Sequence, residues 1–224
     1  MLFITLGTLL LHVQFAKVGW FFRYEAYLFA LAVPSIAVAL PDVVLRTTAW
    51  LGDAPVRLSV VVLASVALLM PLFHRATVVG LTPTATSNIY QQQYRMARFL
   101  GAYYDGQSVA LNDIGAVTYY TDVRLFDTFG LGSLESATLR LQGRTSAHGT
   151  EALARQADVR VAIVYDEWLM RDGGVPASWQ KAGEWSVSNP VAVDKPTVVF
   201  YAVEPTELAP LRQRLGAFAQ REAR

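Results

Sequence analysis

The sequence has 224 residues, enough for one or two domains, and 53% of them are hydrophobic, above the usual share in a soluble protein. A net charge of +1 provides no basic stripe for nucleic acid, and the absence of cysteine excludes disulfides, thiolate metal sites and a cysteine nucleophile. The histidines, His12, His74 and His148, lie far apart without ligand spacing, so we expect neither a metal site nor a bound cofactor.

Charged residues divide the chain into two parts. Residues 1–75 contain 8 of the 37 Lys, Arg, Asp and Glu residues, and the remaining 149 residues contain 29. We therefore predict a membrane α-helical segment over residues 1–80, followed by a small α/β domain with a partly parallel sheet over residues 81–224.

Three apolar runs in the first part predict transmembrane helices, over about residues 1–16, 22–41 and 57–74. Aromatic residues such as Trp20 and Trp50 stand beside the runs, as is typical of the membrane–water interface. Buried helices of a soluble bundle are the alternative, but such helices need a polar face, which LSVVVLASVALLMPLF lacks.

The first run, MLFITLGTLLLHVQF, has neither the basic start nor the cleavage site of a signal peptide. It contains the polar residues His12 and Gln14, which would be costly against lipid, so we expect protein neighbours for them. The run reads as if it began in mid-membrane, and we expect further N-terminal helices or a separate catalytic subunit.

Basic residues do not decide the orientation of the segment in the membrane. Three membrane spans would nevertheless place the loop at residues 16–23 and the α/β domain on the same side of the membrane.

The motif FRYEAYL places Arg23, Tyr24 and Glu25 at the mouth of the second apolar run. A guanidinium at this depth can hold an anionic lipid phosphate through two parallel hydrogen bonds. Interfacial anchoring is the alternative, with the arginine reaching toward the headgroups and the tyrosines forming part of an aromatic belt.

The second part alternates between helix and strand patterns. A linker at LTPTATSN precedes a helix that Ser87 or Asn88 would cap, and a last helix near the C-terminus would be frayed by Pro210. Between them we predict strands at 108–111, 123–126, VRVAIVYDEW, EWSVS and TVVFYAVEP, with helices in SLESATLRLQ and TEALARQAD. The β-branched run VRVAIV is typical of the middle of a buried sheet.

Polar turns follow the first two strands, with Asn112 and Asp113 after one and Asp127 after the other. Ligands of open parallel sheets bind at this edge, so Asn112 and Asp113 are candidate binding residues. A structural turn is the alternative, in which Asn112 or Asp113 caps a helix and Gly115 permits a close backbone approach. The G-x-G-x-x-G fingerprint is absent, so no dinucleotide is implied.

Two further polar features carry weaker signals. In YDEW, Asp166 and Glu167 could form an acid–base pair, but neighbouring residues on a strand point to opposite faces and should not converge. His148 lies in TSAHGT, which we predict to be a solvated loop.

The segments GWFFRYEAYL and VALNDIGAVTYYTDVRLFDTFGL resemble the C-terminal portion of bacterial GT-C-type glycosyltransferases, similar to the protein mannosyltransferase and aminoarabinose transferase families. The resemblance extends from about Leu11 to Phe200. It implies an inner-membrane enzyme that takes a sugar from a polyprenyl-phosphate carrier, with the α/β domain on the periplasmic side. It also makes Arg23, with Tyr24 and Glu25, a candidate contact of the carrier phosphate.

The family's catalytic acidic residue lies in an N-terminal extramembrane loop that has no counterpart in this chain. We therefore expect the chain alone to be inactive. A second hypothesis is a non-catalytic, membrane-anchored periplasmic module that binds a partner or a glycan. An in-frame upstream continuation encoding further apolar helices and an acidic loop would favour the enzyme.

Overall fold

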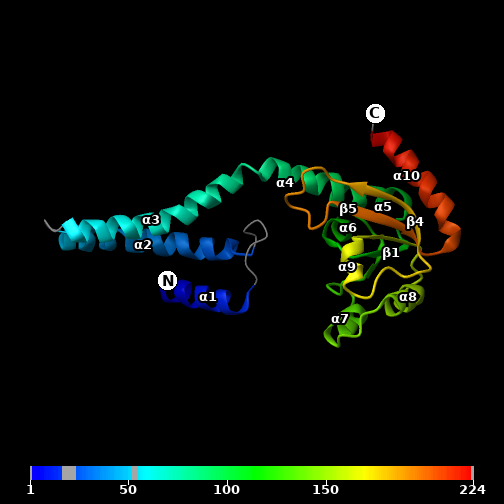
Figure 1. Cartoon of the computed structure of the whole chain (residues 1–224), viewed down its shortest axis with the longest axis horizontal. Helices are drawn as coiled ribbons and strands as arrows, with labels where there is room; N and C mark the ends of the chain where they lie inside the picture. Colours follow the sequence, from blue (N-terminus) through cyan, green and yellow to red (C-terminus); the bar gives the residue numbers. More distant parts are fainter. Residues whose placement is uncertain (1, 17–23, 52–54, 223–224) are drawn as a thin grey trace. The chain divides into compact units, whose positions relative to one another are not determined.

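The computed structural model describes residues 2–16, 24–51 and 55–222. These residues form two compact units, Met1–Thr82 and Pro83–Arg224 (Figure 1). The described part of the first unit is helical, and the second unit contains a five-stranded mixed sheet with helices packed around it.

The first unit consists of α1 (Leu2–Phe15), α2 (Ala26–Leu51) and α3 (Pro55–Val79). Within the described residues, one helix is long and apolar enough to cross a membrane: Ala26–Trp50, with a mean hydropathy of 2.2. The proline residues Pro34 and Pro41 lie inside this helix, which membrane helices tolerate better than soluble ones. The other two predicted spans stay predictions.

A row of polar contacts joins α1 to α2. The hydroxyls of Thr5 and Ser35 lie 2.7 Å apart, and His12 Nδ1 lies 2.5 Å from the hydroxyl of Tyr27. His12 is only 3% exposed, which confirms the expectation that its ring has a protein neighbour. The Gln14 side chain is exposed among the described residues, so the same expectation stays a prediction for Gln14. Such hydrogen bonds between apolar helices are the usual polar contacts of helix packing in a bilayer.

The second unit has five strands in the order β2-β1-β3-β5-β4. The parallel strands are β1 (Ser108–Leu111), β2 (Arg124–Asp127) and β3 (Val161–Val164), whereas β5 (Thr197–Ala202) runs antiparallel to both β3 and β4 (Gln180–Ser186). The sheet is therefore mixed and partly parallel, as predicted. The β-branched run occupies the central strand β3, also as predicted.

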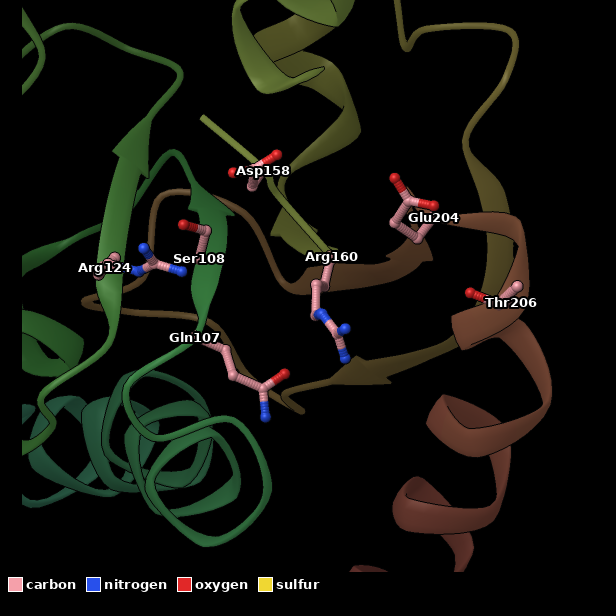
Figure 2. Close-up of a pocket in the computed structure, with 7 residues that line it drawn as sticks. All are labelled: Gln107, Ser108, Arg124, Asp158, Arg160, Glu204 and Thr206. Atoms are coloured by element: carbon pink, nitrogen blue, oxygen red, sulfur yellow. The ribbon is translucent and has the colours of Figure 1, made fainter. Parts of the chain in front are cut away.

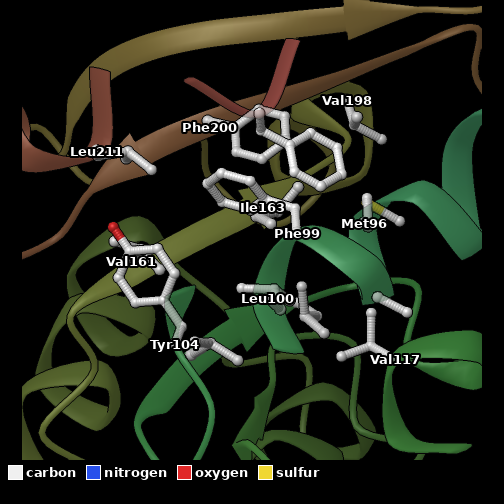
Figure 3. Close-up of a cluster of buried hydrophobic side chains, with 14 of the residues drawn as sticks. Met96, Phe99, Leu100, Tyr104, Val117, Val161, Ile163, Val198, Phe200 and Leu211 are labelled. Atoms are coloured by element: carbon white, nitrogen blue, oxygen red, sulfur yellow. The ribbon is translucent and has the colours of Figure 1, made fainter. Parts of the chain in front are cut away.

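Each face of the sheet has its own hydrophobic core, because successive strand residues point to opposite sides. Val109 and Leu111 lie in one core with residues of α5 (Arg95–Tyr103) and α10 (Leu208–Glu222). Figure 3 shows this core, in which Phe99 and Phe200 lie close together. Ala110 points into the other core, together with residues of α8 (Ala147–Gln156) and α9 (Asp166–Met170). The strands β1, β3 and β5 are thus buried between two layers of helices, whereas β4 is largely exposed.

The chain reverses its direction of winding at β1. From β1 it passes through α6 (Gly115–Tyr120) to β2 on one side, and from there through α7 (Leu134–Leu141) and α8 to β3 on the other. Right-handed crossovers in opposite directions place their helices on opposite faces, which agrees with α6 contributing to the first core and α8 to the second. The carboxyl ends of β1 and β3 therefore form a topological switch point, where open α/β sheets bind their ligands.

The predicted linker is helical. Helix α4 (Thr82–Ile89) continues through a π turn, η1 (Tyr90–Tyr94), into α5. Ser87 and Asn88 lie inside this helix and do not cap it, so that prediction is wrong. The reason is tertiary: Asn88 is buried, and its Oδ1 accepts a hydrogen bond of 2.7 Å from the backbone of Val191.

Three other local predictions also need correction. The strand in VRVAIVYDEW ends at Val164, and Asp166 and Glu167 occupy the first turn of α9, where acidic side chains complement the helix dipole. Pro210 does not fray α10, because it lies in the first turn, where its missing N–H has no helical acceptor. His148 lies in α8 rather than a loop, although it is exposed as predicted.

We expect residues 83–224 to fold as an independent soluble fragment with cooperative unfolding. A fragment that begins at Ser87 should be less stable, because it lacks the first turn of α4 and the buried Ala85. Circular dichroism and gel filtration of both fragments check this result. An aggregated or unstructured longer fragment would contradict it.

Candidate functional site

A π turn places two consecutive glutamines in the interior of the α/β domain. Gln92 is fully buried and Gln93 is 6% exposed. Consecutive side chains of an α-helix diverge by about 100°, and the wider π turn reduces this angle. Both amides consequently reach the hydroxyl of Tyr165, at 2.7 Å for Gln92 Oε1 and 3.1 Å for Gln93 Nε2. Single π turns inside helices occur frequently at functional sites.

The Tyr165 hydroxyl is the centre of this buried network. It donates to Gln92, accepts from Gln93, and lies 3.1 Å from Asp113 Oδ2. Burial raises the pKa of Tyr165 well above its usual range, and the charge of Asp113 raises it further. The hydroxyl therefore stays protonated and serves as a hydrogen-bond donor rather than as a base or a nucleophile.

Asn112 connects the ends of the two strands at the switch point. Its Nδ2 donates to the Tyr165 carbonyl oxygen and its Oδ1 accepts from the Tyr165 backbone N–H, both at 3.0 Å. The side chain is 2% exposed, and it continues the hydrogen-bonding pattern of the sheet beyond the ends of β1 and β3. It does not cap α6, whose N-cap residue, Ile114, makes no side-chain cap bond. The predicted capping role is therefore wrong.

Asp113 is held by the same network. Its Oδ2 accepts from Gln93 Nε2 at 3.0 Å and lies beside the Tyr165 hydroxyl, while the side chain is half-buried. The structure thus brings the two predicted residues Asn112 and Asp113 together with Gln92, Gln93 and Tyr165. Gln92, Gln93 and Tyr165 were not predicted from the sequence, although polar residues one helical turn before the core residue Met96 were a usable signal for the glutamines.

Asp127, at the end of β2, is a structural turn residue, as the alternative interpretation predicted. It is fully buried, and its carboxylate accepts hydrogen bonds from the backbone of Phe129 at 2.8 Å and Gly132 at 2.6 Å. In the same turn Gly130 has a φ of +95°, and a Cβ there would lie 2.6 Å from the Ala137 nitrogen. The turn therefore requires glycine at position 130.

Asp166 and Glu167 do not converge on a common point. Asp166 accepts a hydrogen bond of 2.8 Å from the Tyr201 hydroxyl, and its burial raises the pKa of the carboxyl group. Glu167 is exposed on the same short helix. The absence of an acid–base pair at these two positions agrees with the sequence-based expectation, although the local structure is a helix.

A cavity of about 350 Å³ lies at the opposite, amino edge of the parallel strands (Figure 2). Its lining is mostly polar and combines two guanidinium groups with two carboxylates: Gln107, Ser108, Arg124, Asp158, Arg160, Glu204 and Thr206. This edge is not the one at which parallel sheets usually bind their ligands, and the lining charges balance. The cavity is therefore separate from the network around Tyr165.

A buried carboxylate stabilises the structure next to this cavity. Glu207 is 7% exposed and interacts with Arg160 at 3.0 Å, Arg214 at 3.2 Å and the Tyr104 hydroxyl at 3.2 Å. Burial raises the pKa of Tyr104 to about 12, and the hydrogen bond from Arg214 opposes this effect. The hydroxyl consequently stays neutral through the physiological range.

The raised pKa of Tyr104 predicts a loss of stability in alkali. A tyrosine with a raised folded pKa contributes its full stability below its unfolded pKa of about 10, and this is lost as pH rises through about 12. Residues 83–224 should lose roughly 1 kcal/mol between pH 9 and pH 11 from this group. Urea unfolding at both pH values should show a smaller loss for Tyr104→Phe. The exposed Tyr119→Phe is the matched control, and an unchanged loss in Tyr104→Phe would contradict the prediction.

The candidate contacts of the carrier phosphate, Arg23, Tyr24 and Glu25, are only partly within the described residues. Arg23 lies outside them. Tyr24 is half-buried and Glu25 is 7% exposed, and the Glu25 carbonyl accepts the backbone N–H of Leu28 at the start of α2. Their role toward a carrier phosphate stays a prediction.

Together these features define an α/β domain whose parallel strands wind in two directions from β1, attached to a segment of apolar helices. Residues 87–201 match the family described as Domain of unknown function (DUF8728), and the chain belongs to this family. The matched range contains the π-turn glutamines, Asn112, Asp113 and Tyr165. No curated protein and no solved structure matches the chain.

Proposed function

We propose that the chain is the C-terminal part of a bacterial inner-membrane glycosyltransferase of the GT-C type, which takes its sugar from a polyprenyl-phosphate carrier. In this proposal the α/β domain is a non-catalytic part of the enzyme on the periplasmic side of the membrane. The resemblance of GWFFRYEAYL and VALNDIGAVTYYTDVRLFDTFGL supports the enzyme class, and the apolar helix Ala26–Trp50 supports a membrane location.

The closed switch point is the observation that supports a non-catalytic domain. Ligands of open α/β sheets enter between the strand ends at this point, but here the Asn112 amide spans them with two hydrogen bonds to Tyr165. Nearby, Asp113 is held by Gln93 and Tyr165, and Asp127 by backbone N–H groups of its own turn. These polar groups stabilise the fold, so we assign the chemistry to a part of the enzyme other than this domain.

The alternative module that binds a glycan or a protein differs from this proposal in one measurable property. A part of a carrier-dependent enzyme should bind a polyprenyl phosphate, and the sequence just before α2, which contains Arg23, Tyr24 and Glu25, is the predicted contact. A module that binds a glycan or a protein is not expected to bind this lipid. Affinity for the carrier lipid therefore separates the two hypotheses.

We expect the purified chain to transfer no sugar when it is expressed alone. The measurement is release of radiolabelled sugar from polyprenyl-phosphate mannose and polyprenyl-phosphate aminoarabinose in vesicles, compared with protein-free vesicles. Turnover above this blank would contradict this expectation and the non-catalytic role of the α/β domain. If Asp113→Asn then abolished the turnover, the carboxyl edge of the sheet would be the active site.

A further inference from the structure

Four tyrosines form a continuous cluster on the surface of the α/β domain. The ring centroids of Tyr90 and Tyr94 are 5.2 Å apart, those of Tyr94 and Tyr120 are 5.1 Å apart, and those of Tyr119 and Tyr120 are 4.8 Å apart. Three of the rings are well exposed, with 56% for Tyr90, 80% for Tyr119 and 58% for Tyr120. The tyrosine cluster therefore joins the π turn to α6 and presents several large amphipathic side chains outward.

The two chain segments that carry the tyrosine cluster contain no charged residue. Residues 76–94 include no Lys, Arg, Asp, Glu or His, and neither do residues 114–121, which include α6. The outward face of a helix in water is ordinarily charged or strongly polar. Here the exposed residues of α4 and η1 are threonine, serine, proline, isoleucine, glutamine and tyrosine. This composition suits the boundary between water and lipid better than bulk water.

In the sequence, the tyrosine cluster begins only a few residues after the apolar helices. Tyr90 follows Val79, the last residue of α3, by eleven residues. Even a fully extended chain of this length spans only about 40 Å. The uncharged run 76–94 begins inside α3 and ends at Tyr94, so one stretch of uncharged sequence connects the apolar segment to the tyrosine cluster.

We propose that the tyrosine cluster inserts into the headgroup region of the bilayer and holds the α/β domain against the membrane surface. The proposal rests on the membrane location of the helical segment in the proposed function. Tyrosine suits this region because its ring enters the acyl boundary while its hydroxyl bonds to water and headgroups. An uncharged cluster depends on ring burial rather than on anionic lipid, so the contact should persist at high salt.

The absence of cysteine makes the test direct, because single cysteines can carry a nitroxide label in the otherwise native full-length chain. The chain is reconstituted into vesicles of phosphatidylethanolamine and phosphatidylglycerol at 3:1, and each label's collision rate with oxygen is compared with that of a water-soluble nickel complex. Tyr119→Cys reports on the tyrosine cluster, Val38→Cys on α2, and Gln213→Cys on the charged surface of α10. The exposed Leu141→Cys is the apolar control on α7.

We expect the oxygen-to-nickel ratio at position 119 to be several-fold higher than at 141 and 213, and to lie between their value and that at 38. Adding Tyr90→Ser and Tyr120→Ser should lower the ratio at 119 to the value at 141. A lipid-like ratio at 38 with a water-like ratio at 119 would overturn the proposal and leave the membrane location intact. A water-like ratio at 38 would overturn the membrane location itself. An immobilised label at 119 without oxygen access would indicate a protein contact and also overturn the proposal.

Discussion

The substitution Asn112→Ala should destabilise the α/β domain by about 3 kcal/mol, because it leaves a buried N–H and a buried carbonyl of Tyr165 without partners. The unfolding midpoint of residues 83–224 should fall by roughly 1–2 M in urea. Asn112→Asp should cost a similar amount, because a carboxylate oxygen would then face the Tyr165 carbonyl oxygen.

Asn88→Ala is the matched control for this experiment. Asn88 is as deeply buried as Asn112, but its Oδ1 bonds to the backbone at Val191 in the β4–β5 loop instead of joining two strands. Its loss should cost less, about 1 kcal/mol, because the backbone N–H groups of Val191 and Ala192 lie in a partly exposed loop, where water can replace the lost hydrogen bonds. Equal destabilisation by both substitutions would contradict the special role of Asn112. Little effect of Asn112→Ala would show that the switch point is not held by this side chain.

The second large effect is expected at Arg23. If its guanidinium holds a carrier phosphate, Arg23→Ala should lower the affinity of the full-length chain for undecaprenyl phosphate by roughly 10- to 100-fold. Arg23→Lys should retain part of this affinity, because it keeps the charge but loses the planar, bidentate geometry. Binding is measured by titrating the lipid phosphate into the chain in nanodiscs.

Lys17→Ala is the control for loss of one positive charge in the same predicted loop, and it should weaken binding only slightly. Interfacial anchoring predicts that lysine replaces Arg23 freely, since an extended ammonium reaches the headgroups equally well. Unchanged affinity in both Arg23 variants would therefore leave this residue an anchor. It would also remove the main support for carrier binding at FRYEAYL.

Several features of the fold follow from short-range patterns that one sequence contains. The β-branched run VAIV is apolar at every position, as a strand buried on both faces requires, and it forms the central strand β3. The acidic turn at Asp127 is also local, because its carboxylate bonds to backbone groups two and five residues later. In both cases the decisive interactions lie within a few residues of each other or depend on hydrophobicity alone.

Other features depend on contacts between distant residues. Ser87 and Asn88 look like helix caps, but the partner of Asn88 is more than one hundred residues away, at Val191. The same is true of the candidate site: Gln92, Asp113 and Tyr165 meet at one hydroxyl although they come from three elements separated by 21 to 73 residues. No local pattern specifies such a meeting.

By itself, the sequence determined the division into an apolar helical part and a mixed α/β part, because hydropathy and alternation act through the composition of each segment. It also determined that Asn112 and Asp113 stand at the carboxyl end of a strand. Only the tertiary structure decided what these residues do there, since strand order places β3 beside β1 and brings Tyr165 within reach of Asn112. Strand order is set by the packing of whole layers of helices and strands. For this reason Asn112, predicted as a turn residue, joins the ends of β1 and β3 through its hydrogen bonds to Tyr165.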